Sequence, residues 1–138
     1  MNHMPRTKDR NTEAELKRIA MDYAEGWYTG DAARMEAACH PDMIKRTLIR
    51  SGDGWVTGPI STAKAMVEWT AKGGGTDWLG EPLYEIEVLD VFRDMATVRC
   101  GSPEYVDHLQ LANFGPEGWK IVNVLWQLRK GDFAPSPS

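Results

Sequence analysis

The chain has 138 residues, 42% of them hydrophobic and 26% charged, which favours one globular domain with a sizeable core. Sixteen basic and twenty acidic residues give a formal net charge of −4. This balance argues against nucleic acid or an anionic membrane as a partner, because phosphate binding needs clustered Lys and Arg. No apolar run approaches the roughly 20 residues of a membrane span, and the polar start of the chain lacks the apolar region of a signal peptide.

The cysteines indicate the expected cellular compartment, and the composition of the chain ends indicates where the folded domain begins and ends. Cys39 and Cys100 are the two cysteines. Without a CxxC pair, they predict a reduced, cytoplasmic chain with neither a disulfide framework nor a zinc site. The polar residues 1–11 and the Pro- and Ser-containing residues 131–138 predict disordered tails. One folded domain is therefore expected over residues 12–130.

The first predicted element is an amphipathic helix. Thr12 and Glu15 form a capping box at its start, in which a hydroxyl and a carboxylate bind free N–H groups of the first turn. Its apolar residues recur at helical spacing and are Leu16, Ile19, Ala20, Tyr23, Ala24 and Trp27. Gly30 is expected to end this helix as a left-handed cap.

Two shorter helices are predicted after it. Asp31 is placed to cap a second helix that runs through Ala38, with Met35 and Ala38 facing inward, and that stops before Pro41. A third helix is expected to open at residues 59–61 and to stop at the three glycines 73–75. Its inner stripe consists of Ala63, Met66, Val67 and Thr70.

Strands and turns make up the rest of the chain. Alternating polar and apolar residues between turn signals predict strands at 43–50, 55–57, 84–92, 95–101, 105–114 and 119–128. Ser102 and Pro103 interrupt this series, which indicates a bulge or a sheet edge, because Pro has no N–H to donate. Three helices followed by a long antiparallel meander are typical of an α+β fold.

Several short segments carry a family resemblance. They are residues 23–31 (YAEGWYTGD), 35–41, 45–46, 85–91 (EIEVLDV), 105–109 (YVDHL) and 119–126 (WKIVNVLW). In these segments the chain resembles the putative lumazine-binding branch of the nuclear transport factor 2-like superfamily, to which SnoaL-like and ketosteroid-isomerase-type proteins belong. The resemblance spans about residues 13–128. It implies a cone-shaped α+β barrel, with three N-terminal helices packed on a highly curved antiparallel sheet that encloses a pocket, while activity does not transfer with a fold.

Asp107 is the first candidate for chemistry in such a pocket. Alternation along residues 105–111 puts Asp107 on the more apolar face, with Leu109 and Leu111. Burial there raises the pKa of a carboxyl group, which suits a general acid or base. The alternative interpretation is a structural salt bridge or a contact that ties neighbouring strands together.

A cation on the strand at 43–50 is the expected partner of Asp107. The alternation pattern does not decide whether Lys45 or Arg46 points inward, and the resemblance favours Arg46. An inward arginine orients a carboxylate or enolate through its planar guanidinium group. The alternatives are a charge on the solvated rim and a pair with Asp107 that only holds the fold together.

Three further side chains are candidates for proton transfer or hydrogen bonding. His40 follows the second helix at the expected pocket mouth, where a histidine could shuttle protons, unless it only caps the helix or anchors a loop. Tyr23 faces the cone and is placed to donate a hydrogen bond to a substrate oxygen, unless it is an aromatic core residue. His108 is expected to face outward, at the surface or in a dimer interface.

The pocket walls are expected to be apolar. The candidate ligand contacts are Trp27, Trp55, Met66, Asn123 and Trp126. The sequence holds no spaced pair of metal ligands, no phosphate-binding loop and no nucleophile motif, so neither a metal nor another cofactor is predicted.

The sequence favours a cofactor-independent lyase or isomerase, of the dehydratase, isomerase or cyclase type, that acts on a hydrophobic or aromatic molecule. Asp107 or His40 would move the proton, and Tyr23 and Arg46 would hold the developing oxyanion. The alternative is a non-catalytic ligand-binding or dimerisation module. A homodimer through the outer face of the sheet, at His108, Gln110 and Ala112, is expected under both hypotheses.

Overall fold

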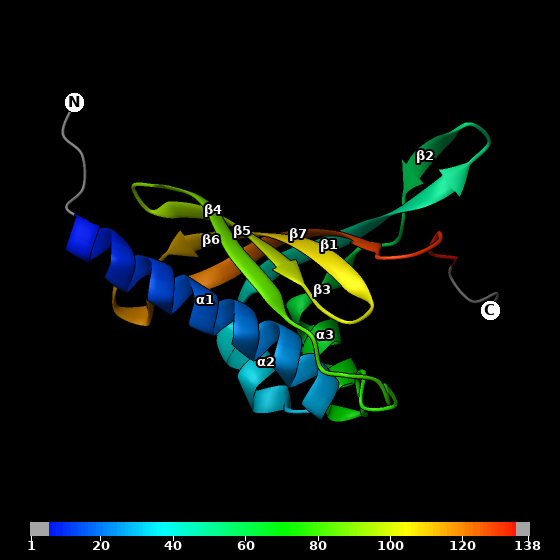
Figure 1. Ribbon diagram of the computed structural model, residues 1–138, viewed down its shortest axis with the longest axis horizontal. Coiled ribbons are helices and arrows are strands. Elements are labelled where there is room, and N and C mark those ends of the chain that lie inside the picture. Colours follow the sequence, from blue (N-terminus) through cyan, green and yellow to red (C-terminus); the bar gives the residue numbers. More distant parts are fainter. Residues whose placement is uncertain (1–5, 135–138) are drawn as a thin grey trace.

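The computed structural model describes residues 6–134 and confirms the α+β class (Figure 1). Its helices are α1 (Arg6–Thr29), α2 (Ala32–Ala38) and α3 (Ala63–Ala71). Its strands are β1 (Cys39–Ser51), β2 (Gly54–Thr57), β3 (Ser61–Thr62), β4 (Glu85–Phe92), β5 (Met95–Gly101), β6 (Tyr105–Asn113) and β7 (Trp119–Leu128). A short 3-10 helix, Gly115–Glu117, joins β6 to β7. No helix in the described part has the length and apolar character needed to span a membrane.

The strands form one mixed sheet rather than the purely antiparallel sheet expected. The order is β2-β1-β7-β6-β5-β4, with β3 beside β1, and the β1–β7 pair is parallel. Between β1 and β7 the chain passes through α3 and the strands β4, β5 and β6. This long connection lets β7 enter the sheet beside β1 in the same direction. The sheet stays open between its edge strands β2 and β4. Register shifts in three strand pairs, β1–β7, β4–β5 and β6–β7, bend the sheet around the helices.

The three helices cover one face of the sheet (Figure 1). The predicted stripe of α1 supplies much of the core, with Leu16, Ile19, Ala20, Tyr23 and Ala24 all buried. The predicted inner residues of α2 and α3 are buried as well, except that Val67 is only partly buried. The face of the sheet toward the helices therefore holds the core, and any cavity in it is enclosed by both layers.

The start of α1 differs from the prediction. The helix already includes Arg6, six residues before the expected cap at Thr12. Residues 6–11 hold neither Pro nor Gly, so nothing in them breaks the helix although they lack an apolar stripe. Of the predicted N-terminal tail, residues 6–11 are helical and residues 1–5 lie outside the described residues.

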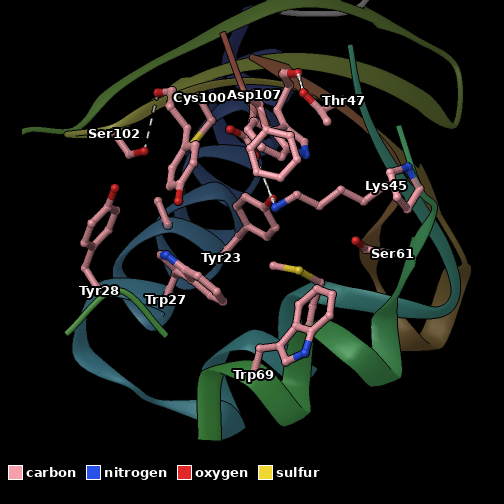
Figure 2. A pocket seen from close by; sticks show the side chains of 16 residues that line it. Tyr23, Trp27, Tyr28, Lys45, Thr47, Ser61, Trp69, Cys100, Ser102 and Asp107 are labelled. Carbon is pink, nitrogen blue, oxygen red and sulfur yellow. Dashed lines mark hydrogen bonds and ion pairs between the residues drawn. The ribbon is translucent and has the colours of Figure 1, made fainter. Parts of the chain in front are cut away.

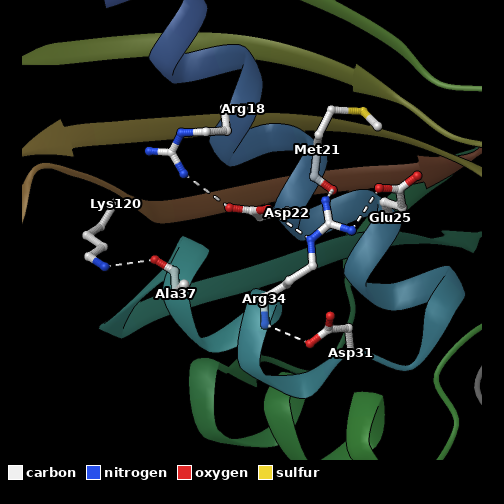
Figure 3. A network of polar contacts seen from close by, with 8 residues as sticks. All are labelled: Arg18, Met21, Asp22, Glu25, Asp31, Arg34, Ala37 and Lys120. Atoms are coloured by element: carbon white, nitrogen blue, oxygen red, sulfur yellow. Dashed lines mark hydrogen bonds and ion pairs between the residues drawn. The ribbon is translucent and has the colours of Figure 1, made fainter.

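The connection between α1 and α2 follows the sequence signals. Gly30 has a φ of +69°, the left-handed conformation of a helix cap, and the carboxylate of Asp31 accepts a hydrogen bond from the Arg34 N–H at 3.1 Å. The Arg34 guanidinium then binds Asp22 at 2.9 Å and Glu25 at 2.7 Å (Figure 3). These contacts join α2 to α1 and so fix which side of α1 faces the sheet.

The three glycines after α3 end that helix, as predicted, and also support the neighbouring helix. Gly74 has a φ of +51°, and a Cβ added there would lie 2.5 Å from the backbone oxygen of Trp27. The Gly75 N–H donates to the same oxygen at 2.9 Å. The loop can therefore pack closely against the C-terminal end of α1, where Trp27 lies.

Two predicted boundaries are corrected by local hydrogen bonds. The third helix begins at Ala63 rather than at residues 59–61, because the Thr62 hydroxyl caps it by accepting from the Ala65 N–H at 3.1 Å. Ser102 and Pro103 form the turn between β5 and β6 rather than a bulge or edge. The Ser102 N–H closes this turn by donating to the Tyr105 carbonyl at 2.9 Å.

Candidate functional site

A cavity of about 300 Å³ lies between α1, α3 and the inner face of the sheet. Its wall is rich in aromatic side chains, which are Tyr23, Trp27, Tyr28, Trp69, Tyr105, Trp126 and Phe133. Met66 and Cys100 add further apolar surface. An aromatic wall of this kind suits a hydrophobic ligand with a flat ring system.

Three polar side chains from separate elements meet at this wall (Figure 2). Lys45 Nζ on β1 donates to the Tyr23 hydroxyl on α1 at 2.6 Å. That hydroxyl donates to Asp107 Oδ2 on β6, also at 2.6 Å. Lys45 Nζ lies 3.8 Å from the same carboxylate oxygen. We call Lys45, Tyr23 and Asp107 the polar triad.

Local structure explains why these residues converge. On β1, Met43 and Thr47 are buried while Arg46 is exposed, so Lys45 shares the inner face with the two buried residues. On β6, Asp107 alternates with exposed His108, as the sequence predicts. Tyr23 belongs to the buried stripe of α1.

Burial opposes charge at the triad. It raises the pKa of Asp107, although Lys45 and the hydrogen bond from Tyr23 act in the other direction. It lowers the pKa of Lys45 against the attraction of Asp107. It also raises the pKa of Tyr23 well above its ordinary value, an effect that the nearby Asp107 charge increases. Burial therefore brings the pKa of Lys45 and the pKa of Asp107 closer together than they are in water, because it favours the neutral form of each.

Lys45 is the member of the triad most open to the cavity. Its side chain is 14% exposed, against 6% for Asp107. Its Nζ lies 5.1 Å from the Tyr23 ring centroid and 5.6 Å from that of Trp126. Of the triad, Lys45 therefore offers a ligand in the cavity the most exposed side chain.

A second polar group lies on the other side of the cavity from Lys45 (Figure 2). The Tyr28 hydroxyl donates to Glu104 Oε1 at 3.1 Å and accepts from the Glu104 N–H at 3.2 Å. Ser102 lines the wall beside it. The cavity therefore has polar side chains on two opposite sides of its aromatic wall.

The sequence of residues 11–127 matches the family described as putative lumazine-binding. The chain belongs to this family. No curated protein matches it significantly. As a member of the family it shares a nuclear transport factor 2-like fold with solved structures, which confirms the resemblance found in its sequence segments.

Three solved structures illustrate this shared fold. A nuclear transport factor 2-like protein of unknown function from Silicibacter pomeroyi is 15% identical, with a TM-score of 0.63 over 91% of this chain and 100% of that one. A ketosteroid isomerase-like protein from Erwinia carotovora atroseptica is 15% identical, with a TM-score of 0.59 over 86% and 96%. A type 2 hexachlorocyclohexane dehydrochlorinase is 14% identical, with a TM-score of 0.56 over 95% and 98%.

Five of the residues singled out in the sequence line the cavity together. They are Tyr23, Trp27, Met66, Asp107 and Trp126. Lys45, which alternation alone could not choose over Arg46, lies beside them. Arg46 is exposed, opposite Leu125 of β7 on the outer face of the sheet.

The other three candidates lie away from the cavity lining. The His40 ring stacks on Phe114 with centroids 4.3 Å apart, and its Nδ1 accepts the Asp42 N–H at 3.0 Å, so the contacts of His40 lie outside the cavity. Trp55 on β2 lies under the Arg50 guanidinium at 4.0 Å. Asn123 is exposed on the outer face, where its amide donates to Gln110 at 3.2 Å.

Phe133 is a cavity residue that the sequence interpretation missed. The sequence predicts that it belongs to a disordered C-terminal tail, residues 131–138, of which the structure describes 131–134. Its ring packs edge-on against Trp126 at 5.1 Å, and Asp132 binds Arg50 at 3.4 Å. The signal in the sequence that could have placed Phe133 in the cavity is its aromatic side chain within a Pro- and Ser-containing tail. Such a side chain is stabilised by packing on an apolar surface.

Within residues 6–134, no group of three or more His, Cys, Asp or Glu side chains is arranged to hold a metal ion. The triad supplies one carboxylate, one amine and one phenol, a set suited to proton transfer.

The two thiols are expected to be unreactive in the native protein. Cys39 and Cys100 are free and buried, and burial raises the pKa of each to about 12. Because the thiolate is the nucleophile, titration with a disulfide reagent at pH 8 should detect no native thiol and two after unfolding. Rapid reaction of Cys100 in the native state would instead mean that reagents enter the cavity and find a thiolate there.

Proposed function

We propose that the protein is a cofactor-independent lyase or isomerase that moves a proton on a hydrophobic or aromatic small molecule. The single observation that carries this proposal is the polar triad at the wall of an aromatic cavity. A filled core with a neutralised ion pair would have favoured a structural role. Here the ionisable groups border open space of about 300 Å³.

Lys45 is the group that we assign to contact the substrate, because its side chain is the most exposed of the three. As an amine it takes a proton from carbon or oxygen, and as an ammonium group it stabilises an oxyanion. Tyr23 and Asp107 position Lys45 and share its proton through their hydrogen bonds. Lys45 thus takes the place that the sequence interpretation gave to Arg46, and His40 has no role in this mechanism.

The substrate class follows from the cavity walls. The edge-on aromatic rings of the wall favour a flat or hydrophobic molecule, and the triad favours a carbonyl, enol or phenol oxygen on it. Two structural neighbours are named as a ketosteroid isomerase-like protein and a dehydrochlorinase, names that refer to reactions of this kind. The family description adds lumazine, a flat bicyclic dione, to the molecules worth testing.

A ligand screen by thermal shift tests whether the cavity binds a small molecule, which the proposal requires. The panel contains lumazine, a flavin, aromatic ketones, a steroid and a polyketide-like compound. A ligand at a hundredfold excess over its Kd adds about 2.7 kcal/mol to native-state stability. We expect a clear shift for at least one compound, and a smaller shift in Lys45→Met.

The matched control is Arg46→Met, which removes a cation from the neighbouring position on the outer face. It should leave the ligand-induced shift unchanged. Equal shifts in Lys45→Met and the native protein would contradict a ligand contact at Lys45, and no shift across the panel would contradict the ligand-binding proposal itself.

A non-catalytic ligand-binding module is the second candidate. The observation that favours it is that the Tyr23 hydroxyl already both accepts and donates a hydrogen bond within the protein. Under this alternative, ligands bind and depend on Lys45, but no proton exchanges with them.

A homodimer through the outer face of the sheet also remains our proposal, together with the cytoplasmic location expected from the two cysteines. His108 and Gln110 are exposed there, and Leu125, paired with His108, is 47% exposed. Sedimentation equilibrium should give twice the chain mass for the native protein. A dimeric mass for Leu125→Glu as well would contradict an interface at this face.

A further inference from the structure

The two hydrogen bonds of the triad run in the same direction. Lys45 donates to Tyr23, and Tyr23 donates to Asp107, each at 2.6 Å. If each donor passes its proton to its acceptor, an ammonium–carboxylate pair becomes an amine and a carboxylic acid. No net charge leaves the cavity in this exchange. The hydroxyl of Tyr23 ends with one proton, as it began.

Burial at Lys45 and Asp107 makes that exchange less costly than it is in water. The groups that face its nitrogen are Asp107, the Tyr23 hydroxyl and the thiols of Cys39 and Cys100. Both thiols are buried and bear a raised pKa, so they stay neutral. Burial favours uncharged forms of Lys45 and Asp107, and the aromatic wall adds only weak attraction for an ammonium group.

We propose that Lys45 forms a covalent imine with an aldehyde or ketone held in the aromatic cavity. This inference rests on the proposed function in so far as both need a ligand to enter the same cavity. It goes further by naming a carbonyl compound as the substrate class and by giving Lys45 a nucleophilic role.

The step balances without an oxidant or reductant. The lone pair of Lys45 Nζ attacks the carbonyl carbon, and the oxygen takes a proton from Tyr23, which regains one from the protonated Asp107. The nitrogen of the resulting carbinolamine gives up a proton to the Asp107 carboxylate through Tyr23. Its lone pair then expels the hydroxyl group, which leaves as water after taking a proton from the same chain. The result is one C=N bond and one water molecule.

Trapping with a reductant tests the imine directly. The full chain is incubated at pH 6 with benzaldehyde and sodium cyanoborohydride, and the sites of benzylation are mapped by mass spectrometry. Exposed lysines, with a pKa of about 10.4, are almost wholly ammonium at pH 6 and react slowly. We expect Lys45 to be benzylated at least tenfold faster than any other lysine.

Two matched variants serve as controls for this experiment. Lys45→Arg keeps the cation but cannot form the imine, so the fast benzylation should disappear. Arg46→Lys adds a lysine on the outer face, which should react no faster than other exposed lysines. Benzylation of Lys45 at the rate of exposed lysines overturns the inference.

The failure of this inference is distinguishable from that of the proposed function. If benzyl alcohol, which has no carbonyl group, raises the melting temperature while Lys45 escapes benzylation, the imine is excluded and ligand binding stands. If Lys45 is benzylated rapidly but no ligand exchanges a proton in deuterated water, the imine stands and proton-transfer catalysis does not.

Discussion

Asp107→Leu is expected to lower the free energy of unfolding by about 3 kcal/mol, because it leaves the amine of Lys45 buried without its partner. Lys45→Met should be destabilising for the converse reason. The double variant Lys45→Met/Asp107→Leu should be clearly more stable than the sum of the single losses predicts, since apolar side chains of similar volume replace the pair. It should still fall short of the native protein by about 1–3 kcal/mol, because the buried Tyr23 hydroxyl loses both partners. Urea unfolding of the four proteins measures this coupling.

The pH dependence of Asp107→Leu identifies Lys45 as the source of the loss. Burial lowers the folded-state pKa of Lys45, and removing Asp107 lowers it further, because the Asp107 charge opposes that shift. Between this lowered pKa and the unfolded value of about 10.4, the unfolded chain binds more protons, so stability rises with pH. The destabilisation should therefore be larger at pH 6 than at pH 9. Additive losses in the double variant would mean that the two side chains are not coupled.

Tyr23→Phe is expected to slow proton transfer to a bound ligand by about 100- to 1,000-fold, the usual effect of losing a positioned proton donor. The hydroxyl joins Lys45 to Asp107 and is the path for the shared proton. The ring remains and still lines the cavity, so the Kd of the ligand should change by only a few-fold. This combination, a lower kcat at similar affinity, marks an interaction of the transition state.

Tyr84→Phe is the matched control for Tyr23→Phe. Tyr84 lies outside the cavity lining, with its ring 6.2 Å from that of Tyr28, so removing its hydroxyl should leave the rate unchanged. Equal rates for Tyr23→Phe and the native protein would contradict a proton path through Tyr23.

Alternation identified Asp107 because β6 has one clearly apolar face. Leu109 and Leu111 lie on the same side as Asp107, whereas His108 and Gln110 lie on the other, so the pattern decides the orientation of the carboxylate. The helical stripe placed Tyr23 and Trp27 for the same reason, since an amphipathic helix can bury only its apolar side.

The same argument could not orient β1, because each face of this strand carries a cation. By alternation, Lys45 shares one face with Met43 and Thr47, and Arg46 shares the other face with Ile44 and Leu48. What settles the choice is the pairing of β1 with β7, a parallel contact between segments about 80 residues apart. No local pattern encodes such a contact, nor the return of Phe133 onto Trp126.

Hydrogen–deuterium exchange on a bound carbonyl compound tests the central claim most directly. The compound is the one from the ligand screen that stabilises the protein most and has a hydrogen on the carbon next to its carbonyl group. In deuterated buffer, nuclear magnetic resonance should show that hydrogen replaced by deuterium in the presence of the native protein and not of Lys45→Met. A compound that binds but exchanges no faster than in buffer alone would contradict catalysis by the polar triad and leave a binding protein.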